Sequence, residues 1–550
     1  MSTTESETHQ AAAPSRRPRR RRRRLVRALA GVLGVTLALA IVWAAASWRY
    51  GALDARKARM TTPGPYRADL ASLGAHPVPD WFADAKLGVF VHWGLSSVPG
   101  FAPTKPYADV LRDDYDRAMV RSPYAEDYAN AMRDPSSPTA EYHRRTYGDM
   151  PYEGFQQIFE REVAGFDADE WAATFQRAGA DYVVMVAKYH DGYSLWPTQV
   201  RNPHAPDWHS DRDLVGEVAS AVRARGMRFG VYYSGGVDWT FQRKLVETLG
   251  DYSYLPYGDG YDDYAEAQVR ELVQRYRPDV LWNDISWPTG QQRLNAVFAD
   301  YYNTVPDGVV NDRWQTDSLF RRLMGLPPAR GAFDLFFKQV IARDPGVVDR
   351  VTPPAVPHAD FTTPEYTQYG TTQDFAWETT RGMGTSYGYN RQETDADYAS
   401  FEQTLFPDFV SAVSRNGRLL LNVGPAGGRG RIPPEQRRRL EAFGGWLDAN
   451  GQAVRGTRPH QVAGATTADG LPVWFTRAPG RVNAVLVGRP TGPTVRIQGV
   501  ELPAARGRLL GDGSLVTVTP TGGSTVLTFD HDLDGAFAPA VAVPTGQASR

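Results

Sequence analysis

The stretch ADYVVMVAKYHDG, residues 180–192, places a continuous apolar run directly before a group of polar side chains. Such a run is typical of a strand buried on both faces of a parallel sheet. Similar runs occur at residues 87–92, 229–233, 280–282 and 419–423. Stretches with helical periodicity lie between them, at residues 169–178, 214–225 and 263–276, and Asp167 and Asp213 can serve as N-caps. Repeated strand–helix units of this kind predict an α/β fold with a (β/α)8-like barrel, to which we assign residues 60–455.

The composition changes after Gly456. Short alternating runs at residues 471–476, 482–487, 494–497 and 515–518 are separated by turn-forming residues. This pattern predicts a small C-terminal all-β sandwich over residues 456–550. Two long segments, 102–138 and 315–357, interrupt the barrel pattern and are expected in loops that shape the active-site rim. The second segment could equally form a lid or a subunit contact, so a homo-oligomer stays open.

The first fifty residues contain ten arginines and only two glutamates. Residues 1–27 are expected to be a disordered basic segment in the cytoplasm, and residues 28–48 an apolar transmembrane anchor or signal peptide. Ala44–Ala46 would suit a cleavage site. In either case the remainder of the chain is expected outside the cytoplasm, anchored in the membrane or secreted.

Without its first fifty residues the chain has a formal net charge near −9. An acidic body argues against a nucleic-acid partner, since phosphate binding needs a basic face. The chain has no cysteine, which removes thiolate metal sites and cysteine nucleophiles. It also lacks a phosphate-binding loop, a dinucleotide fingerprint, an HExxH motif and a G-x-S-x-G elbow. We therefore expect no cofactor and no metal.

Polar residues follow the predicted strands, where a barrel places its active site. They occur in the sequences FVHWG (90–94), KYHDG (188–192), YYSGG (232–236), WND (282–284) and NDRW (311–314). One histidine in such a place is more often structural, and one aspartate caps a following helix about as often as it catalyses. Together, however, these residues offer aromatic faces and directional partners for sugar hydroxyls. Glycoside cleavage needs two carboxyl groups that flank one bond.

Read in order, these motifs resemble the retaining α-L-fucosidases of glycoside hydrolase family 29. The resemblance extends over residues 81–454 and rests on WFADAKLGVFVHWGLSSVPGF (81–101), AGADYVVMVAKYHDGYSLWPT (178–198), GMRFGVYYSGGVDW (226–239), PDVLWNDISWP (278–288), VVNDRW (309–314), WETTRGMGTSYGYNR (377–391) and LLLNVGPAGGRGRIP (419–433). It implies a hydrolase that removes terminal α-L-fucose from fucosylated glycans through a covalent fucosyl-enzyme.

The resemblance also implies roles for individual residues. Asp284 corresponds to the nucleophile and Glu365, in DFTTPEY (360–366), to the acid/base; Glu378, Glu393 and Glu402 are its competitors. The two carboxyls should lie roughly 5–5.5 Å apart. The residues expected to bind substrate are His92, Glu141, Tyr189, His190, Tyr232, Trp282 and Arg313.

The chain departs from the family at Tyr189, where a second histidine is common. This larger side chain could change the accepted sugar, for example to an α-L-galactoside. A barrel glycosidase for another sugar and an inactive, membrane-anchored glycan-binding protein are the alternatives.

Overall fold

The computed structural model describes residues 36, 40–344, 347, 354–533 and 535–546. Its larger domain contains a parallel sheet whose strands are hydrogen-bonded in the order β5-β4-β3-β2-β1-β7-β6. The strands are β1 (Leu87–Val91), β2 (Tyr182–Lys188), β3 (Arg228–Ser234), β4 (Val280–Asp284), β5 (Val309–Val310), β6 (Trp377–Gly382) and β7 (Gly417–Val423). Nearly all of their residues are buried, as the apolar runs predict, because helices cover the outside and side chains fill the inside.

Residues 360–366 take the eighth position of the barrel. The amide of Asp360 donates to the carbonyl of Val310 in β5 (2.9 Å), and the amides of Glu378 and Thr380 in β6 donate back to the same segment. Parallel bridges join Thr362 to Trp377 and Glu365 to Thr380. The (β/α)8-like prediction is therefore confirmed as a parallel α/β domain, with an irregular segment in place of one strand.

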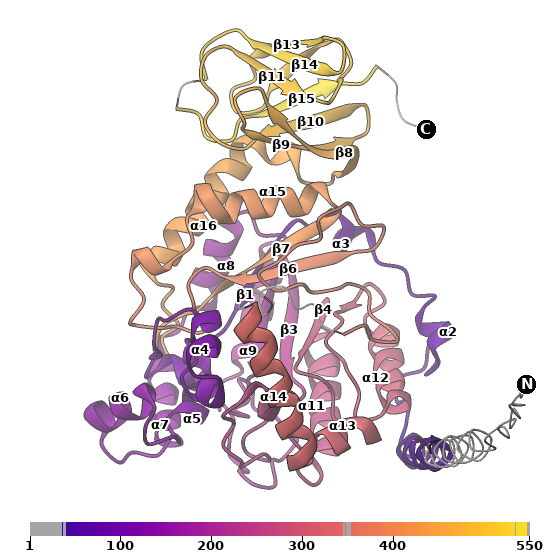
Figure 1. Cartoon of the computed structure of the whole chain (residues 1–550), viewed down its shortest axis with the longest axis vertical. Coiled ribbons are helices and arrows are strands. Elements are labelled where there is room, and N and C mark those ends of the chain that lie inside the picture. The colour runs from indigo at the N-terminus through magenta and orange to yellow at the C-terminus, as the bar shows by residue number, and fades with distance from the viewer. Residues whose placement is uncertain (1–35, 37–39, 345–346, 348–353, 534, 547–550) are drawn as a thin grey trace, which may run out of the picture.

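The helices that follow the strands lie on the outside of the sheet (Figure 1). The main ones are α8 (Ala168–Arg177), α9 (Leu214–Ala224), α11 (Tyr261–Tyr276), α12 (Gln291–Thr304), α15 (Phe406–Ser414) and α16 (Pro434–Asn450). Asp167 and Asp213 cap α8 and α9 through their side chains, as predicted. Two short helices, α2 (Leu70–Leu73) and α3 (Asp80–Asp84), precede β1.

Both predicted insertions form helices. The first insertion and the region after it contain α4 (Tyr107–Asp113), α5 (Tyr128–Ala131), α6 (Pro138–Tyr147) and α7 (Gly154–Glu162). The second insertion contains α13 (Leu319–Met324) and α14 (Pro327–Arg343). A further short helix, α10 (Leu249–Ser253), follows β3. The two insertions touch: Ile341 packs on Val110 and Leu111, and Tyr115 donates to Asp334 (3.0 Å). Segments more than 200 residues apart thus support each other beside the barrel.

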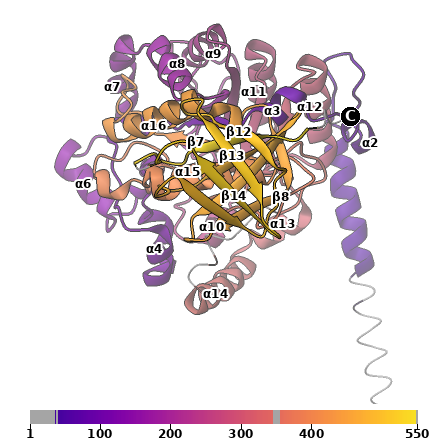
Figure 2. The same ribbon diagram turned by 90° about the horizontal axis from the view of Figure 1, so that it is seen from above.

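The C-terminal domain is all-β, as predicted. Its strands are β8 (Arg458–Thr467), β9 (Pro472–Ala478), β10 (Arg481–Leu486), β11 (Thr494–Gln498), β12 (Ala505–Leu509), β13 (Leu515–Pro520), β14 (Ser524–Phe529) and β15 (Ala540–Pro544). They hydrogen-bond in a closed antiparallel ring, whereas the sequence suggested two separate sheets. The alternating pattern predicts one buried face per strand, and a sandwich and a barrel satisfy it equally well. The ring sits on α15 and α16 (Figures 1 and 2).

Residues 40–55 are helical and lead into the barrel domain. Tyr50 donates a hydrogen bond of 2.5 Å to Asp317, which ties this helix to the start of the second insertion. The predicted basic segment 1–27 and about half of the predicted anchor 28–48 lie outside the described residues. Among the residues that are described, no helix combines the length and apolar character needed to span a membrane.

Candidate active site

The active-site side chains come together at the carboxyl ends of β3 and β4. Ser234 in β3 pairs with Asp284 in β4, so the last residues of both strands lie at one edge. Tyr232 donates its phenol hydrogen to Oδ2 of Asp284 at 2.9 Å. This is the edge at which barrels place their chemistry.

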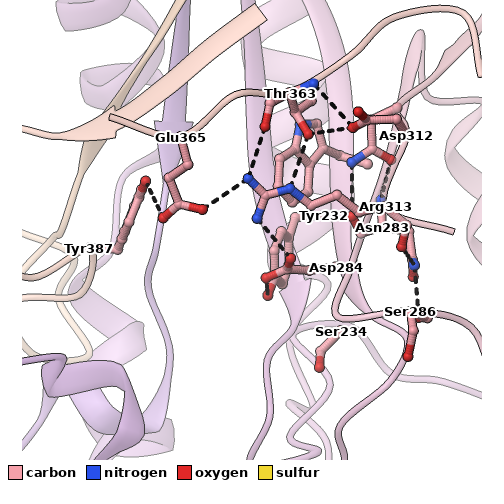
Figure 3. Close-up of polar contacts among 12 residues, drawn as sticks. Tyr232, Ser234, Asn283, Asp284, Ser286, Asp312, Arg313, Thr363, Glu365 and Tyr387 are labelled. Carbon is pink, nitrogen blue, oxygen red and sulfur yellow. Dashed lines mark hydrogen bonds and ion pairs between the residues drawn. The ribbon is translucent and has the colours of Figure 1, made fainter. Parts of the chain in front are cut away.

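Arg313 joins the two predicted catalytic carboxylates. Its Nη1 donates to Oδ1 of Asp284 (3.1 Å) and its Nη2 to Oε2 of Glu365 (2.9 Å). Tyr387 donates to the other oxygen of Glu365 at 2.9 Å. Figure 3 shows Arg313 between the two carboxylates, with Tyr387 on the far side of Glu365. Because one guanidinium reaches both groups, they are close enough to act on one bond.

Thr363 fixes the guanidinium of Arg313. Its hydroxyl accepts from Nε of Arg313 (3.0 Å) and its carbonyl from Nη2 (3.2 Å), and the same hydroxyl donates to Asp312 (2.6 Å). The segment 360–366 therefore positions both the arginine and, two residues later, Glu365.

The two carboxylates differ in exposure. The side chain of Asp284 is 13% exposed and that of Glu365 33% exposed. Burial raises the pKa of Asp284, and the charge of Arg313 opposes this rise. The buried group suits a nucleophile in fixed geometry, and the exposed group suits exchange of protons with water.

Trp282 lies inside the barrel below this pair. Its ring stacks on Tyr232 (centroids 5.5 Å apart), and the guanidinium carbon of Arg313 lies 4.8 Å from its ring centroid. Its Nε1 donates to Glu378 (3.1 Å). Only 1% of Trp282 is exposed, so the structure places it as support for Arg313 and Tyr232, and its predicted contact with sugar stays a prediction.

His92, at the end of β1, is a neutral imidazole. The amide of Asn422 donates to the carbonyl of Tyr387, so its oxygen accepts from Nδ1 of His92 at 2.6 Å. Burial lowers the pKa of His92 to about 3. Its Nε2 has no hydrogen-bond partner among the described residues and can accept from a sugar hydroxyl.

His190 is held on both sides. Ser234 donates to the carbonyl of Val237 and therefore accepts from Nδ1 of His190 (2.7 Å), while Tyr252 donates to Nε2 (2.7 Å). Burial lowers the pKa of His190 well below its usual range. A sugar hydroxyl would have to displace Tyr252, a residue of α10 that the sequence did not single out.

Comparison with known proteins shows the family of this chain. The sequence profile of the family described as alpha-L-fucosidase matches residues 53–325 and 333–452. The tissue alpha-L-fucosidase of Bos taurus is 30% identical over 437 residues, which are 78% of this chain and 79% of the relative. The chain belongs to the α-L-fucosidases.

Solved structures give the same result for the fold. The alpha-fucosidase of Thermotoga maritima, in complex with a mechanism-based inhibitor, aligns with a TM-score of 0.72 and 39% identity, covering 87% of this chain and 100% of that protein. An α-L-fucosidase from Paenibacillus thiaminolyticus shares the fold at 22% identity, with a TM-score of 0.60 over 85% of this chain and 98% of that protein.

The other glutamates of this α-L-fucosidase that could replace Glu365 lie elsewhere. Glu378 is fully buried in the barrel, where Tyr182 and Trp282 donate to it. Glu393 accepts from the amide of Thr385 at 2.7 Å, and Glu402 is on the surface in an ion pair with Arg489. In the described residues, Glu365 is the one of the four that contacts Arg313.

The structure does not bring Glu141 to the site. Its side chain is 65% exposed on α6, and its ion-pair partner in the described part of the chain is Arg145, at 3.8 Å. Two acidic residues of the first insertion lie beside Tyr189 instead: Glu126 and Asp127 are 4% and 3% exposed. The prediction rested on the family resemblance, and a short matched motif does not report which face of α6 points inward. The pair of acids in YAEDY (124–128), beside two tyrosines, was the available signal.

Tyr189 lies beside this acidic pair. Its ring stacks on His190, with centroids 4.0 Å apart, and its hydroxyl points to Asp127. His92, Glu126 and Tyr189 line one cavity. No group of three or more side chains suited to hold a metal occurs in the described residues.

Proposed function

We propose that this α-L-fucosidase acts with retention of configuration, with Asp284 as the nucleophile and Glu365 as the acid/base. In the first step a carboxylate oxygen of Asp284 bonds to C1 of fucose while the bond from C1 to the leaving oxygen breaks. Glu365 gives its proton to that oxygen. In the second step water attacks C1, its proton passes to Glu365, and the bond from C1 to Asp284 breaks.

The single observation that supports these roles is the bridge made by Arg313. A cation shared by two carboxylates lets Asp284 stay ionised in a buried place. When Asp284 becomes an ester, its charge is lost and Arg313 remains paired with Glu365, which is ionised at that stage. The same guanidinium can thus balance charge in both halves of the cycle.

Binding of the sugar is assigned to the aromatic and imidazole groups at the strand ends. His92 offers an acceptor nitrogen, Tyr232 offers a hydroxyl beside Asp284, and Tyr189, whose ring stacks on Tyr232, offers a hydroxyl beside Asp127. We infer that the substrate is a terminal α-L-fucose on an oligosaccharide or glycoconjugate, held with its C1 over Asp284. Tyr189 makes an α-L-galactoside the second sugar to test.

The test is hydrolysis of an aryl α-L-fucoside by a chain that begins near Leu53. We expect Asp284→Ala to reduce kcat by about a thousandfold or more. Glu365→Ala should keep much of its activity on an activated leaving group, and azide should accelerate it by forming an α-L-fucosyl azide. Glu402→Gln, on the surface, is the matched control and should behave as the unmodified chain. Azide giving the β-anomer with Glu365→Ala, or an active Asp284→Ala, would contradict the assigned roles.

Two further outcomes separate the alternatives. Cleavage of an aryl α-L-galactoside in preference to the fucoside would change the sugar but leave the mechanism. Binding of fucose without any hydrolysis would support the inactive glycan-binding protein.

We also propose that the catalytic body lies outside the cytoplasm, held by the apolar segment 28–48 or released after its cleavage. The support is the sequence order: nine arginines come before the apolar stretch 28–48, and this stretch comes before the barrel. Fractionation of cells that express the full chain should place the fucosidase activity with membranes or in the medium, and protease added to intact spheroplasts should degrade it. A protected activity in the cytosol would contradict this location.

A further inference from the structure

Asp127 is a buried residue at a helix N-cap whose side chain does not cap the helix. It ends the 3-10 helix Ala125–Asp127 and is the N-cap residue of α5, yet its side chain makes no capping hydrogen bond. An aspartate in this position usually accepts from an amide of the first turn. The carboxyl of Asp127 instead points to Tyr189.

The hydrogen bonds of Asp127 are few for a group that is 3% exposed. The hydroxyl of Tyr189 lies 3.5 Å from its Oδ1, at the upper limit for a hydrogen bond, and it is the one side-chain partner in the described part of the chain. The adjacent Glu126 accepts from Ser386 and from the amide of Gly388, both at 2.8 Å. A buried carboxyl with one weak partner costs stability unless something else bonds to it.

Asp127 is close to the catalytic centre. Tyr189 lies 6.0 Å, centroid to centroid, from Tyr232, which donates to Asp284. Burial, then the charge of Glu126, and to a smaller extent the charge of Asp284, raise the pKa of Asp127 well above its usual range. A protonated carboxyl can both donate and accept, as can a hydroxyl.

We infer that Asp127 is a specificity-determining residue of the fucose pocket, which hydrogen-bonds a hydroxyl at C3 or C4 of the sugar beside Tyr189. The inference rests on the proposed placement of C1 at Asp284. Tyr189 and Tyr232 stand between Asp127 and Asp284, so Asp127 faces the part of the ring away from C1. The C2 hydroxyl is next to C1 and would therefore lie near Tyr232 and Asp284.

The experiment measures kcat/KM of Asp127→Ala on an aryl α-L-fucoside and on its 2-, 3- and 4-deoxy analogues. On the parent fucoside the loss should be about tenfold to a hundredfold, the range for a buried polar partner. On the 3-deoxy or the 4-deoxy analogue the same substitution should reduce kcat/KM by less than about threefold, because that substrate lacks the hydroxyl that Asp127 would bind. Asp127→Asn, which keeps the shape and one acceptor, should lose less than Asp127→Ala.

The control is Asp116→Ala, an exposed aspartate of the same insertion, which should leave all four values unchanged. Equal losses on all four substrates would mean that Asp127 only supports the fold, and this overturns the inference. So would no loss on any substrate, or a coupling confined to the 2-deoxy analogue. If the unmodified chain does not hydrolyse the fucoside, the proposed function fails first, and that result is visible before any variant is made.

Discussion

Arg313 is the positively charged residue that contacts both carboxylates of the active site. It is 13% exposed, stacks over Trp282 and donates to Asp284, Glu365 and Thr363. Burial by itself would lower the pKa of Arg313, but the charges of Glu365 and Asp284 outweigh this effect and raise it, so Arg313 stays charged at every working pH. Lysine could supply the charge but not the fixed fork that reaches two carboxylates.

Arg313→Met should therefore change the pH profile as well as the rate. The charge of Arg313 lowers the pKa of Asp284 against the effect of burial, so its removal lets that pKa rise. The nucleophile must be ionised, so the acidic limb of kcat/KM should move to higher pH, and kcat/KM at its optimum should fall by about a hundredfold. Arg438→Met, at an exposed position of α16, serves as the control. A lower rate with an unmoved acidic limb would show that Arg313 does not set the ionisation of Asp284.

At the scale of elements, the segment 360–366 determines where Glu365 stands. Asp360 anchors its start: it accepts from the amide of Val310 and from Tyr302, both at 2.7 Å, and contacts Nδ1 of His76 at 3.1 Å. Neither α-helical nor strand periodicity predicts this segment, because it lies where a strand would lie in the barrel but does not form a regular strand. The sequence motif located Glu365, but only these contacts explain why it faces Arg313.

The contact between His76 and Asp360 predicts a pH-dependent stability. Burial lowers the pKa of His76, but the hydrogen bond and the charge of Asp360 outweigh this effect and raise it. A raised pKa stabilises the fold fully below the unfolded value of about 6.5, and this contribution is lost as pH rises through the folded value. The free energy of unfolding by urea should thus decline over that window.

His76→Gln should remove this decline, so the free energy of unfolding of the variant should be nearly the same below and above the window. Equal slopes of unfolding free energy against pH in both proteins would refute the linkage. Activity on aryl fucoside, measured at one pH, reports separately whether the segment 360–366 has moved.

At the scale of the whole molecule, the C-terminal β-barrel shares a core with the catalytic domain. Phe406 of α15 is fully buried and contacts Trp446 of α16 and Phe537 of the C-terminal domain. The indole of Trp446 donates to the carbonyl of Ala538 (2.8 Å), and Arg415 stacks on Trp474 of β9 (4.4 Å). Figure 1 shows these helices between the two domains. The β-domain therefore covers apolar surface that the barrel would otherwise expose.

Phe406→Ala should lower the free energy of unfolding by about 3–5 kcal/mol, the range for truncating a buried phenylalanine. Activity of the folded variant should be near normal, since Phe406 contacts no active-site residue named above. Leu515→Ala, at an exposed position of β13, is the control and should change stability by less than about 0.5 kcal/mol. A loss below about 1 kcal/mol for Phe406→Ala would mean that the domains do not depend on each other.

The order of strands and helices, the change of fold class after Gly456 and the family could all be predicted from the sequence, which also named Asp284, Arg313 and Glu365 as candidates for the site. These follow from local patterns and ordered motifs, because hydrophobic period and short motifs are properties of neighbouring residues. Three features are visible only in the folded chain: residues 360–366 complete the barrel, the C-terminal strands close into a ring, and Asp127 and Glu126 rather than Glu141 lie beside Tyr189. Each of these depends on which surfaces of separate elements meet in the folded chain, and the free energy of such contacts leaves no periodic trace in the sequence.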